Sequence, residues 1–197
     1  MFDLGCGTGL LSLLLLQRER DLQITGLDIQ PDAIRLANLA AEANGLTDRL
    51  TFRVGDLRDR PSLPAGAFDL VVSNPPYFPP DSGLLPEGDS RRMARTEETC
   101  ALEEVCGAAA RLLRWGGSFC VVQKPERLTD LLCSLRQSAL EPKRLRMVTA
   151  RPEKAPSLVL LEARRGGKPG LTIEPLLILE TPDGEPAPEL DRIYFRT

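Results

Sequence analysis

The stretch Asp3-Leu4-Gly5-Cys6-Gly7-Thr8-Gly9 lies between a short apolar segment and a helical pattern over residues 10–20. Its alternating glycines allow the backbone to take positive φ angles and to approach a ligand closely. Asp28 follows the next predicted strand, residues 23–27, where a carboxylate can accept hydrogen bonds from both hydroxyls of a ribose. The spacing differs from the G-x-G-x-x-G of dinucleotide-binding loops, and Asp3 would repel a pyrophosphate. The loop therefore favours a cationic or zwitterionic ligand; a dinucleotide site and a tight turn without a ligand are the alternatives.

The rest of the chain alternates short apolar runs with helical patterns. We expect strands at residues 1–4, 23–27, 50–54, 68–72, 118–122, 144–150 and 158–163, and helices at residues 10–20, 31–44, 97–114 and 126–139. This alternation predicts an α/β fold with a doubly wound, mostly parallel sheet. Because no helix separates the last two predicted strands, we expect one antiparallel strand near the C-terminus.

The predicted elements divide the chain into a domain and a tail. We expect residues 1–170 to form one domain and residues 171–197 to form an irregular, Pro-rich tail packed on it. A strand of a parallel sheet usually has about five residues, whereas the glycine loop here begins at residue 5. The first strand is therefore expected to be incomplete, as in an N-terminally truncated chain.

The composition excludes several classes of function. The 197-residue chain has no histidine, which excludes Ser-His-Asp hydrolysis, Cys-His proteolysis and His-ligated zinc, and we expect no metal site. Its five cysteines form no C-x-x-C pair and accompany no secretory signal, which is typical of reduced thiols in the cytoplasm. The longest apolar run, residues 10–16, is shorter than the ~20 residues of a membrane-spanning helix, so we expect no membrane partner.

A second motif, Ser73-Asn74-Pro75-Pro76-Tyr77-Phe78, follows the apolar run at residues 68–72. A polar residue at the carboxyl end of a central strand lies where open α/β sheets bind ligands. The two prolines fix φ and leave the local carbonyls as acceptors. The Asn74 side chain and the Pro75 carbonyl can then accept hydrogen bonds from the two N–H groups of a planar amino group. Tyr77 and Phe78 can stack on the planar group that carries it. The alternative is a Pro-rich turn after a core strand.

Both motifs resemble those of a known enzyme family. The glycine loop resembles motif I of the class I S-adenosylmethionine-dependent methyltransferases, and N-P-P-Y is similar to motif IV of the amino-group methyltransferases. The resemblance implies S-adenosylmethionine as cofactor, and Asn74, Pro75 and Tyr77 as catalytic residues. It also implies a cofactor site formed by Asp3, Gly5, Gly7, Gly9, Asp28, Ile29, Asp56 and Leu57. In it Asp56 would accept a hydrogen bond from the adenine amino group, although an acid at this position can also be a helix N-cap.

Downstream segments indicate the substrate. The stretches at residues 91–97, 125–128, 154–158 and 164–167 resemble the bacterial tRNA1(Val) (adenine-37-N6)-methyltransferase family, which implies methylation of adenine N6 in tRNA. Residues 111–168 contain 13 basic and 5 acidic side chains, which can steer a polyanion to one face. The expected substrate-binding residues are Pro76, Phe78, Arg91, Arg92, Arg95 and Lys154, with Arg164 and Arg165 as further candidates for phosphate contacts.

Several alternatives stay open at this point. The same motifs occur in enzymes that methylate glutamine N5 in release factors or guanine N2 in ribosomal RNA, and a truncated chain can be a non-catalytic RNA-binding module. Each arginine can instead form an internal salt bridge, such as Arg95 with Glu98. Trp115 is expected to pack at a helix end rather than to stack on a base.

Overall fold

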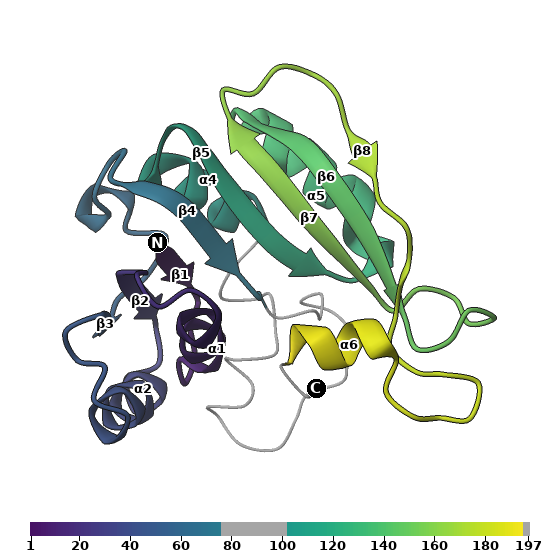
Figure 1. Cartoon of the computed structure of the whole chain (residues 1–197). Coiled ribbons are helices and arrows are strands. Elements are labelled where there is room, and N and C mark those ends of the chain that lie inside the picture. The colour runs from purple at the N-terminus through teal and green to yellow at the C-terminus, as the bar shows by residue number, and fades with distance from the viewer. Residues whose placement is uncertain (76–101, 195–197) are drawn as a thin grey trace, which may run out of the picture.

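A nine-stranded sheet organises the described part of the chain, which comprises residues 1–75 and 102–194 of the computed structural model. The strand order is β3-β2-β1-β4-β5-β7-β6-β8, and β9 pairs with β6 (Figure 1). The strands are β1 (Phe2–Leu4), β2 (Ile24–Asp28), β3 (Leu50–Val54), β4 (Phe68–Ser73), β5 (Leu113–Gln123), β6 (Leu140–Thr149), β7 (Leu158–Arg165), β8 (Thr172–Ile173) and β9 (Leu177–Ile178).

Only one of the described strands runs against the others. β1 pairs in parallel with β2 and β4, β2 with β3, and β4 with β5. β7 is antiparallel to both β5 and β6, whereas β8 and β9 are parallel to β6. The prediction of a mostly parallel sheet with one reversed strand near the C-terminus is confirmed. β7 is antiparallel to β6 because the connection between them, residues 150–157, is too short for a crossover helix.

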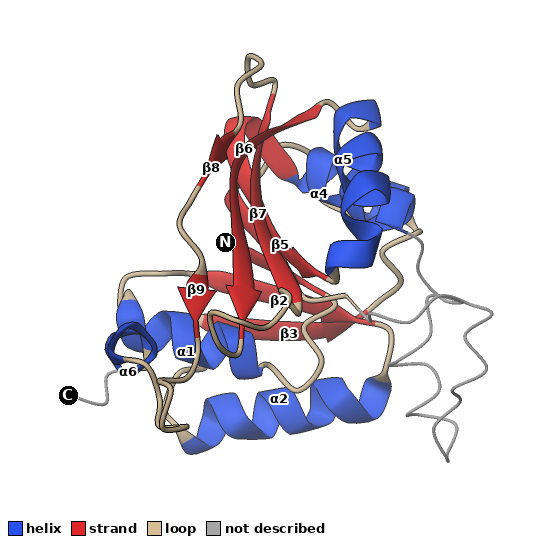
Figure 2. Cartoon of the chain, turned by 90° about the vertical axis from the view of Figure 1, so that its right-hand side faces the viewer, coloured by secondary structure: helices blue, strands red, loops and turns tan. Residues whose placement is uncertain are grey.

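Helices cover the two faces of the sheet. They are α1 (Leu10–Arg18), α2 (Pro31–Ala43), α4 (Leu102–Leu112), α5 (Leu128–Gln137) and α6 (Pro188–Ile193), with two short 3₁₀ turns, η1 (Arg60–Ser62) and η2 (Pro125–Arg127). Figure 2 shows α1 and α2 on one side of the sheet and α4 and α5 on the other. None of these described helices combines the length and the apolar character that crossing a membrane requires.

Two apolar cores follow from this arrangement. The larger lies between the sheet and α4 with α5, and it contains the fully buried Phe2, Phe119 and Leu131. The smaller lies between α1, α2 and strands β2 and β3, where Phe52 packs with Ala37. The helices therefore keep water from the apolar side chains on the strands that they cover.

Several element boundaries differ from the prediction, among them the end of α4. The helix predicted to extend to residue 114 ends at Leu112, and Gly116 and Gly117 lie within β5. The pairing of β4 with β5 shifts register between Phe68 and Leu70, so the glycines belong to an irregular strand start. The tail is also not wholly irregular, because it contains β8, β9 and α6. Elements of two to six residues carry too little periodicity to be seen in a sequence.

Gly9 gives a test of how tightly α1 packs. Its φ is +78°, and a Cβ there would lie 2.8 Å from Cζ of Phe52 and 3.2 Å from Cβ of Ala37. We expect Gly9→Ala to lower the free energy of unfolding by about 2–4 kcal/mol in urea denaturation, because strain and overpacking act together. Gly45, at φ +64° with no described atom within 4 Å of a Cβ, is the matched control. Gly45→Ala should cost only about 1 kcal/mol, and equal losses in the two variants would contradict the crowding at Gly9.

Candidate functional site

A cavity of about 1070 Å³ opens where β1, β2 and β4 end. One part of its lining comes from the glycine loop and the segments that follow β2, β3 and β4. The other part comes from α1 and from β5, β7 and β6, with Tyr194 after α6. Such a position, at the carboxyl ends of the strands, is where open α/β sheets bind their ligands.

The glycine loop presents its backbone to this cavity. Gly5 and Gly7 have φ angles of +73° and +53°, and no described atom lies within 4 Å of a Cβ at either position. The backbone N–H groups of Gly5 and Cys6 both donate to the Leu27 carbonyl, at 2.8 and 3.0 Å, which ties the loop to β2. Gly9 does not belong to the described lining of the cavity, since it packs against Phe52. The first two glycines thus form an open cradle, and the third serves packing.

Asp28 holds the loop at the end of β2. Its carboxylate accepts the backbone N–H of Gly7 at 2.8 Å and that of Gln30 at 3.0 Å. A carboxylate has about four acceptor positions, so two remain for a ligand's hydroxyl groups. Ile29 and Gln30 also line the cavity. Gln30 was not predicted, because only its position after Asp28 distinguishes it in the sequence.

Asp3 lies at the bottom of the cavity and is 1% exposed. Its carboxylate accepts a hydrogen bond of 2.6 Å from the Ser12 hydroxyl. Burial raises the pKa of Asp3 to about 6, with a further rise from the charge of Asp28 and an opposing effect of the Ser12 hydrogen bond. At neutral pH this group is a poorly solvated negative charge, which a cation would stabilise.

Asp56 and Leu57 line the cavity after β3. The Gly55 N–H donates to the Asp28 carbonyl at 2.9 Å, so this loop lies beside the end of β2. Asp56 accepts the backbone N–H of Arg58 at 2.9 Å and pairs with its guanidinium at 2.6 Å, and these hydrogen bonds lower the pKa of Asp56. No described helix begins at Asp56; the carboxylate closes a turn onto the second residue after it. A ligand's amino group would share this carboxylate with Arg58.

Asn74 and Pro75 line the same cavity at the end of β4. The preceding Ser73 is buried, and its hydroxyl donates to the Leu4 carbonyl at 2.7 Å. This bond joins the end of β4 to the start of the glycine loop. Asn74 is exposed, whereas Pro75 is buried. The other residues predicted here and downstream lie outside the described part of the chain: Pro76, Tyr77, Phe78, Arg91, Arg92 and Arg95.

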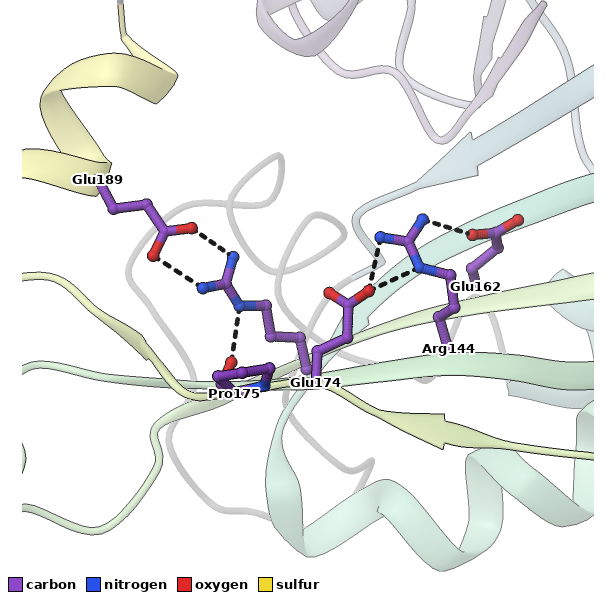
Figure 3. A network of polar contacts seen from close by, with 6 residues as sticks. Arg144, Glu162, Glu174, Pro175 and Glu189 are labelled. Atoms are coloured by element: carbon purple, nitrogen blue, oxygen red, sulfur yellow. Dashed lines mark hydrogen bonds and ion pairs between the residues drawn. The ribbon is translucent and has the colours of Figure 1, made fainter.

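The charges around the cavity are predominantly negative. Its described lining contains the acidic residues Asp3, Asp28, Asp56, Glu162 and Glu174 against only two basic ones, Arg144 and Arg146. Arg144 lies between Glu162, at 3.1 Å, and Glu174, at 2.7 Å (Figure 3). This lining attracts a cation and disfavours a phosphate group.

Part of the basic segment at residues 111–168 is paired with acidic side chains within the protein. Arg144, Arg146 and Arg151 pair with glutamates of the tail. Arg127 and Arg136 pair with acids near them in the sequence, and the Arg165 guanidinium donates to the Leu113 carbonyl. None of these acid pairs involves a predicted phosphate contact: Arg91, Arg92 and Arg95 lie outside the described residues, and Arg164 is exposed.

Lys154 and Trp115 lie away from the cavity. Lys154 is exposed in the connection between β6 and β7, and it does not belong to the described lining. Trp115 is on β5 rather than at a helix end, and it is 73% exposed. Its indole lies over Gly166, where a Cβ would come within 2.2 Å of the ring.

The chain matches a model described as a methyltransferase domain over residues 1–169. It is 37% identical to a tRNA1(Val) (adenine(37)-N6)-methyltransferase of Porphyromonas gingivalis over 166 residues, which are 82% of this chain and 64% of that protein. A protein of the same name from Tolumonas auensis is 33% identical, covering all of this chain and 82% of the relative. The chain thus spans just under two thirds of the Porphyromonas relative.

Solved structures show the same fold at low sequence identity. A predicted O-methyltransferase from Agrobacterium tumefaciens matches 98% of this chain and 87% of its own, with a TM-score of 0.79 and 20% identity. A [4+2]-cyclase matches 83% of this chain and 74% of its own, with a TM-score of 0.62 and 20% identity. Neighbours with such different names share the architecture, so the fold alone does not define the reaction.

Proposed function

Because this chain belongs to the methyltransferase-domain family, we propose that it transfers a methyl group from S-adenosylmethionine to an exocyclic amino nitrogen, adenine N6 in tRNA. The observation that carries this proposal is that Asn74 and Pro75 line the same cavity as the glycine loop and Asp28. A nucleoside-type donor and a planar amino group would therefore meet in one cavity. The hydrogen bond from Ser73 to the Leu4 carbonyl holds these two parts in a fixed relation.

The residues of the cavity suit S-adenosylmethionine. The open backbone at Gly5 and Gly7 leaves room for a ligand to approach, and Asp28 retains acceptor positions for ribose hydroxyls. The buried negative charge of Asp3 suits a ligand with a sulfonium and an amino group. When bound, this cofactor supplies an electrophilic methyl carbon, and the carbon–sulfur electron pair goes to sulfur as the new nitrogen–carbon bond forms.

The chain's own contribution to the reaction is positioning. The Asn74 side-chain oxygen and the Pro75 carbonyl accept hydrogen bonds from the two N–H groups of the substrate amino group. This favours a more pyramidal nitrogen, whose lone pair is otherwise delocalised into the ring. The methylated nitrogen is acidic enough to lose its proton to water, so orientation and electrostatics are sufficient without a general base. Tyr77 and Phe78, outside the described residues, are proposed to stack on the base.

The choice of tRNA rests on the names of the relatives and on the charge of the cavity. The predominantly acidic lining suits an uncharged base better than a phosphate. The phosphates of a tRNA would then bind outside the cavity, with Lys154 and the arginines at positions 91, 92 and 95 as the proposed contacts. The internal pairing of the other arginines leaves less free basic surface than the sequence predicts, and this keeps a protein glutamine as the second candidate substrate.

The proposed function can be tested by methyl transfer to three substrates in parallel. The protein is incubated with labelled S-adenosylmethionine and either unmodified tRNA, ribosomal RNA or a release factor. We expect incorporation into tRNA, and N6-methyladenosine as the new nucleoside in mass spectrometry. Methylglutamine in the release factor or N2-methylguanosine in ribosomal RNA, without N6-methyladenosine, would replace this proposal by the corresponding alternative. Absence of transfer to all three would overturn it.

A further inference from the structure

The C-terminal tail is attached to β6 by three arginine–glutamate pairs. Arg144 contacts Glu174 at 2.7 Å, and Arg151 contacts Glu180 at 2.9 Å. The third pair is bidentate: the two terminal nitrogens of Arg146 donate to the two carboxylate oxygens of Glu189 at 2.7 and 2.8 Å (Figure 3). Each arginine lies on β6 or directly after it, and each glutamate belongs to the tail. Planar two-point contacts of this kind define an orientation as well as a distance.

The bidentate pair attaches the first turn of α6 to β6. Glu189 is in the first turn of this helix, and Arg146 also donates from Nε to the Pro175 carbonyl at 2.9 Å. The Ala187 N–H donates to the Leu179 carbonyl at 2.8 Å, which connects the helix start to the segment after β9. The helix is therefore held at its beginning by one side-chain pair and one backbone bond.

The other end of α6 delivers an aromatic residue to the cavity. Tyr194 caps the helix, with its N–H donating to the Leu190 carbonyl at 3.0 Å. It lines the cavity together with Asn74 and with Leu10 and Leu14 of α1. In Figure 1 the carboxyl end of α6 points toward α1. Tyr194 is 46% exposed, so part of its side chain remains accessible.

The order of the strands puts the attachment of the tail in the half of the sheet away from the cofactor residues. The glycine loop, Asp28 and Asp56 follow β1, β2 and β3, which form one half of the sheet. The tail is paired with β6 in the other half, and β4 with its Asn74 lies between the two halves. Tyr194 thus belongs to a segment anchored in the half of the sheet that does not carry the cofactor residues, and it shares the cavity with Asn74.

We propose that Tyr194 is a substrate-binding residue whose ring packs against the target base, and that the Arg146–Glu189 pair positions it. This inference rests on the proposed function, since it requires a base at Asn74. The surroundings agree with a neutral, planar ligand: Arg144 is neutralised by two carboxylates and Arg146 by Glu189, so no free positive charge remains on this described wall for a phosphate. A neutral, planar ligand can be bound by packing against an aromatic ring, and Tyr194 supplies one here.

The test separates substrate binding from cofactor binding. Tyr194→Ala should raise KM for tRNA about 5- to 150-fold, the range expected for one stacked base, and leave the Kd for S-adenosylmethionine within twofold in calorimetry. Tyr194→Phe should restore KM to within about threefold, because the ring is kept. Glu189→Gln should also raise KM for tRNA. The double variant Arg146→Glu with Glu189→Arg, which restores a pair of opposite charges, should reverse part of this increase.

The matched control is Asp130→Asn, which breaks the exposed Arg127–Asp130 pair at the start of α5, on the opposite face of the sheet. It should leave KM unchanged. A Tyr194→Ala variant that weakens S-adenosylmethionine binding instead, or that keeps the KM of an active parent, overturns this inference while the proposed function stands. A parent protein that methylates no tRNA overturns the proposed function and this inference with it.

Discussion

Asn74→Ala is expected to lower kcat for methyl transfer by at least 100-fold while the Kd for S-adenosylmethionine changes by no more than about threefold. In the proposed mechanism its side-chain oxygen accepts a hydrogen bond from one of the two amino N–H groups, and the loss of one such preorganised contact typically reduces kcat by 10²–10³. Asn74 lies at the end of β4, whereas Asp3, Asp28 and Asp56 come from other strands and loops. The cofactor site should therefore remain intact. Single-turnover kinetics and calorimetry measure the two effects separately.

The control for this variant is Asn44→Ala. Asn44 is an exposed residue at the end of α2, and its side chain donates to the Ala40 carbonyl at 2.7 Å. Its replacement removes the same chemical group far from the cavity and should leave kcat unchanged. Retention of more than a tenth of the parent activity in Asn74→Ala would show that the amino group is positioned by other residues.

Asp3→Asn is expected to weaken S-adenosylmethionine binding at pH 7.5 by about tenfold or more, because it removes a buried charge that faces a cationic ligand. The parent should lose affinity in the same way as the pH falls through about 6, where Asp3 becomes protonated. The variant's affinity should be nearly independent of pH over this range. Isothermal titration between pH 5 and 8 gives both curves, and parallel curves for the two proteins would exclude Asp3 as the titrating group.

The stability of the parent should depend on pH in the opposite direction to its affinity for S-adenosylmethionine: the affinity rises with pH, whereas the stability falls. The folded pKa of Asp3 lies above its unfolded value of 3.8, so the folded state binds more protons between these two pKa values. The parent's stability from this group therefore decreases as the pH rises from about 4 to about 6, by up to about 3 kcal/mol. Asp3→Asn lacks this decrease, and its stability relative to the parent should rise over this window. Asp32→Asn, at an 86% exposed carboxylate of α2, is the control and should change neither quantity.

Much of the fold could be predicted because its signals are local. The alternating strands and helices, the glycine loop at residues 5–9 and the reversed β7 all follow from periodicity, loop length and turn-forming residues within short windows. The positions of Asp28 and Asn74 at strand ends are local in the same sense, since a strand's end already indicates the ligand-binding edge of a parallel sheet. These features do not depend on which strand pairs with which.

The tail and the charge of the cavity are different, because they depend on the order of the strands. Glu189 pairs with Arg146, which is 43 positions earlier in the sequence. Tyr194 lines the same cavity as Asp3, near the other end of the chain. In the sequence, the arginines at residues 144–151 predict a basic surface. In the structure, glutamates of the tail lie beside them and pair with them. Pairing between distant residues is a property of three-dimensional packing, and no pattern within β6 or α6 encodes the partner. The motifs alone therefore indicate a nucleoside donor and an amino acceptor, whereas only the assembled sheet decides which charges remain free and which ring faces the substrate.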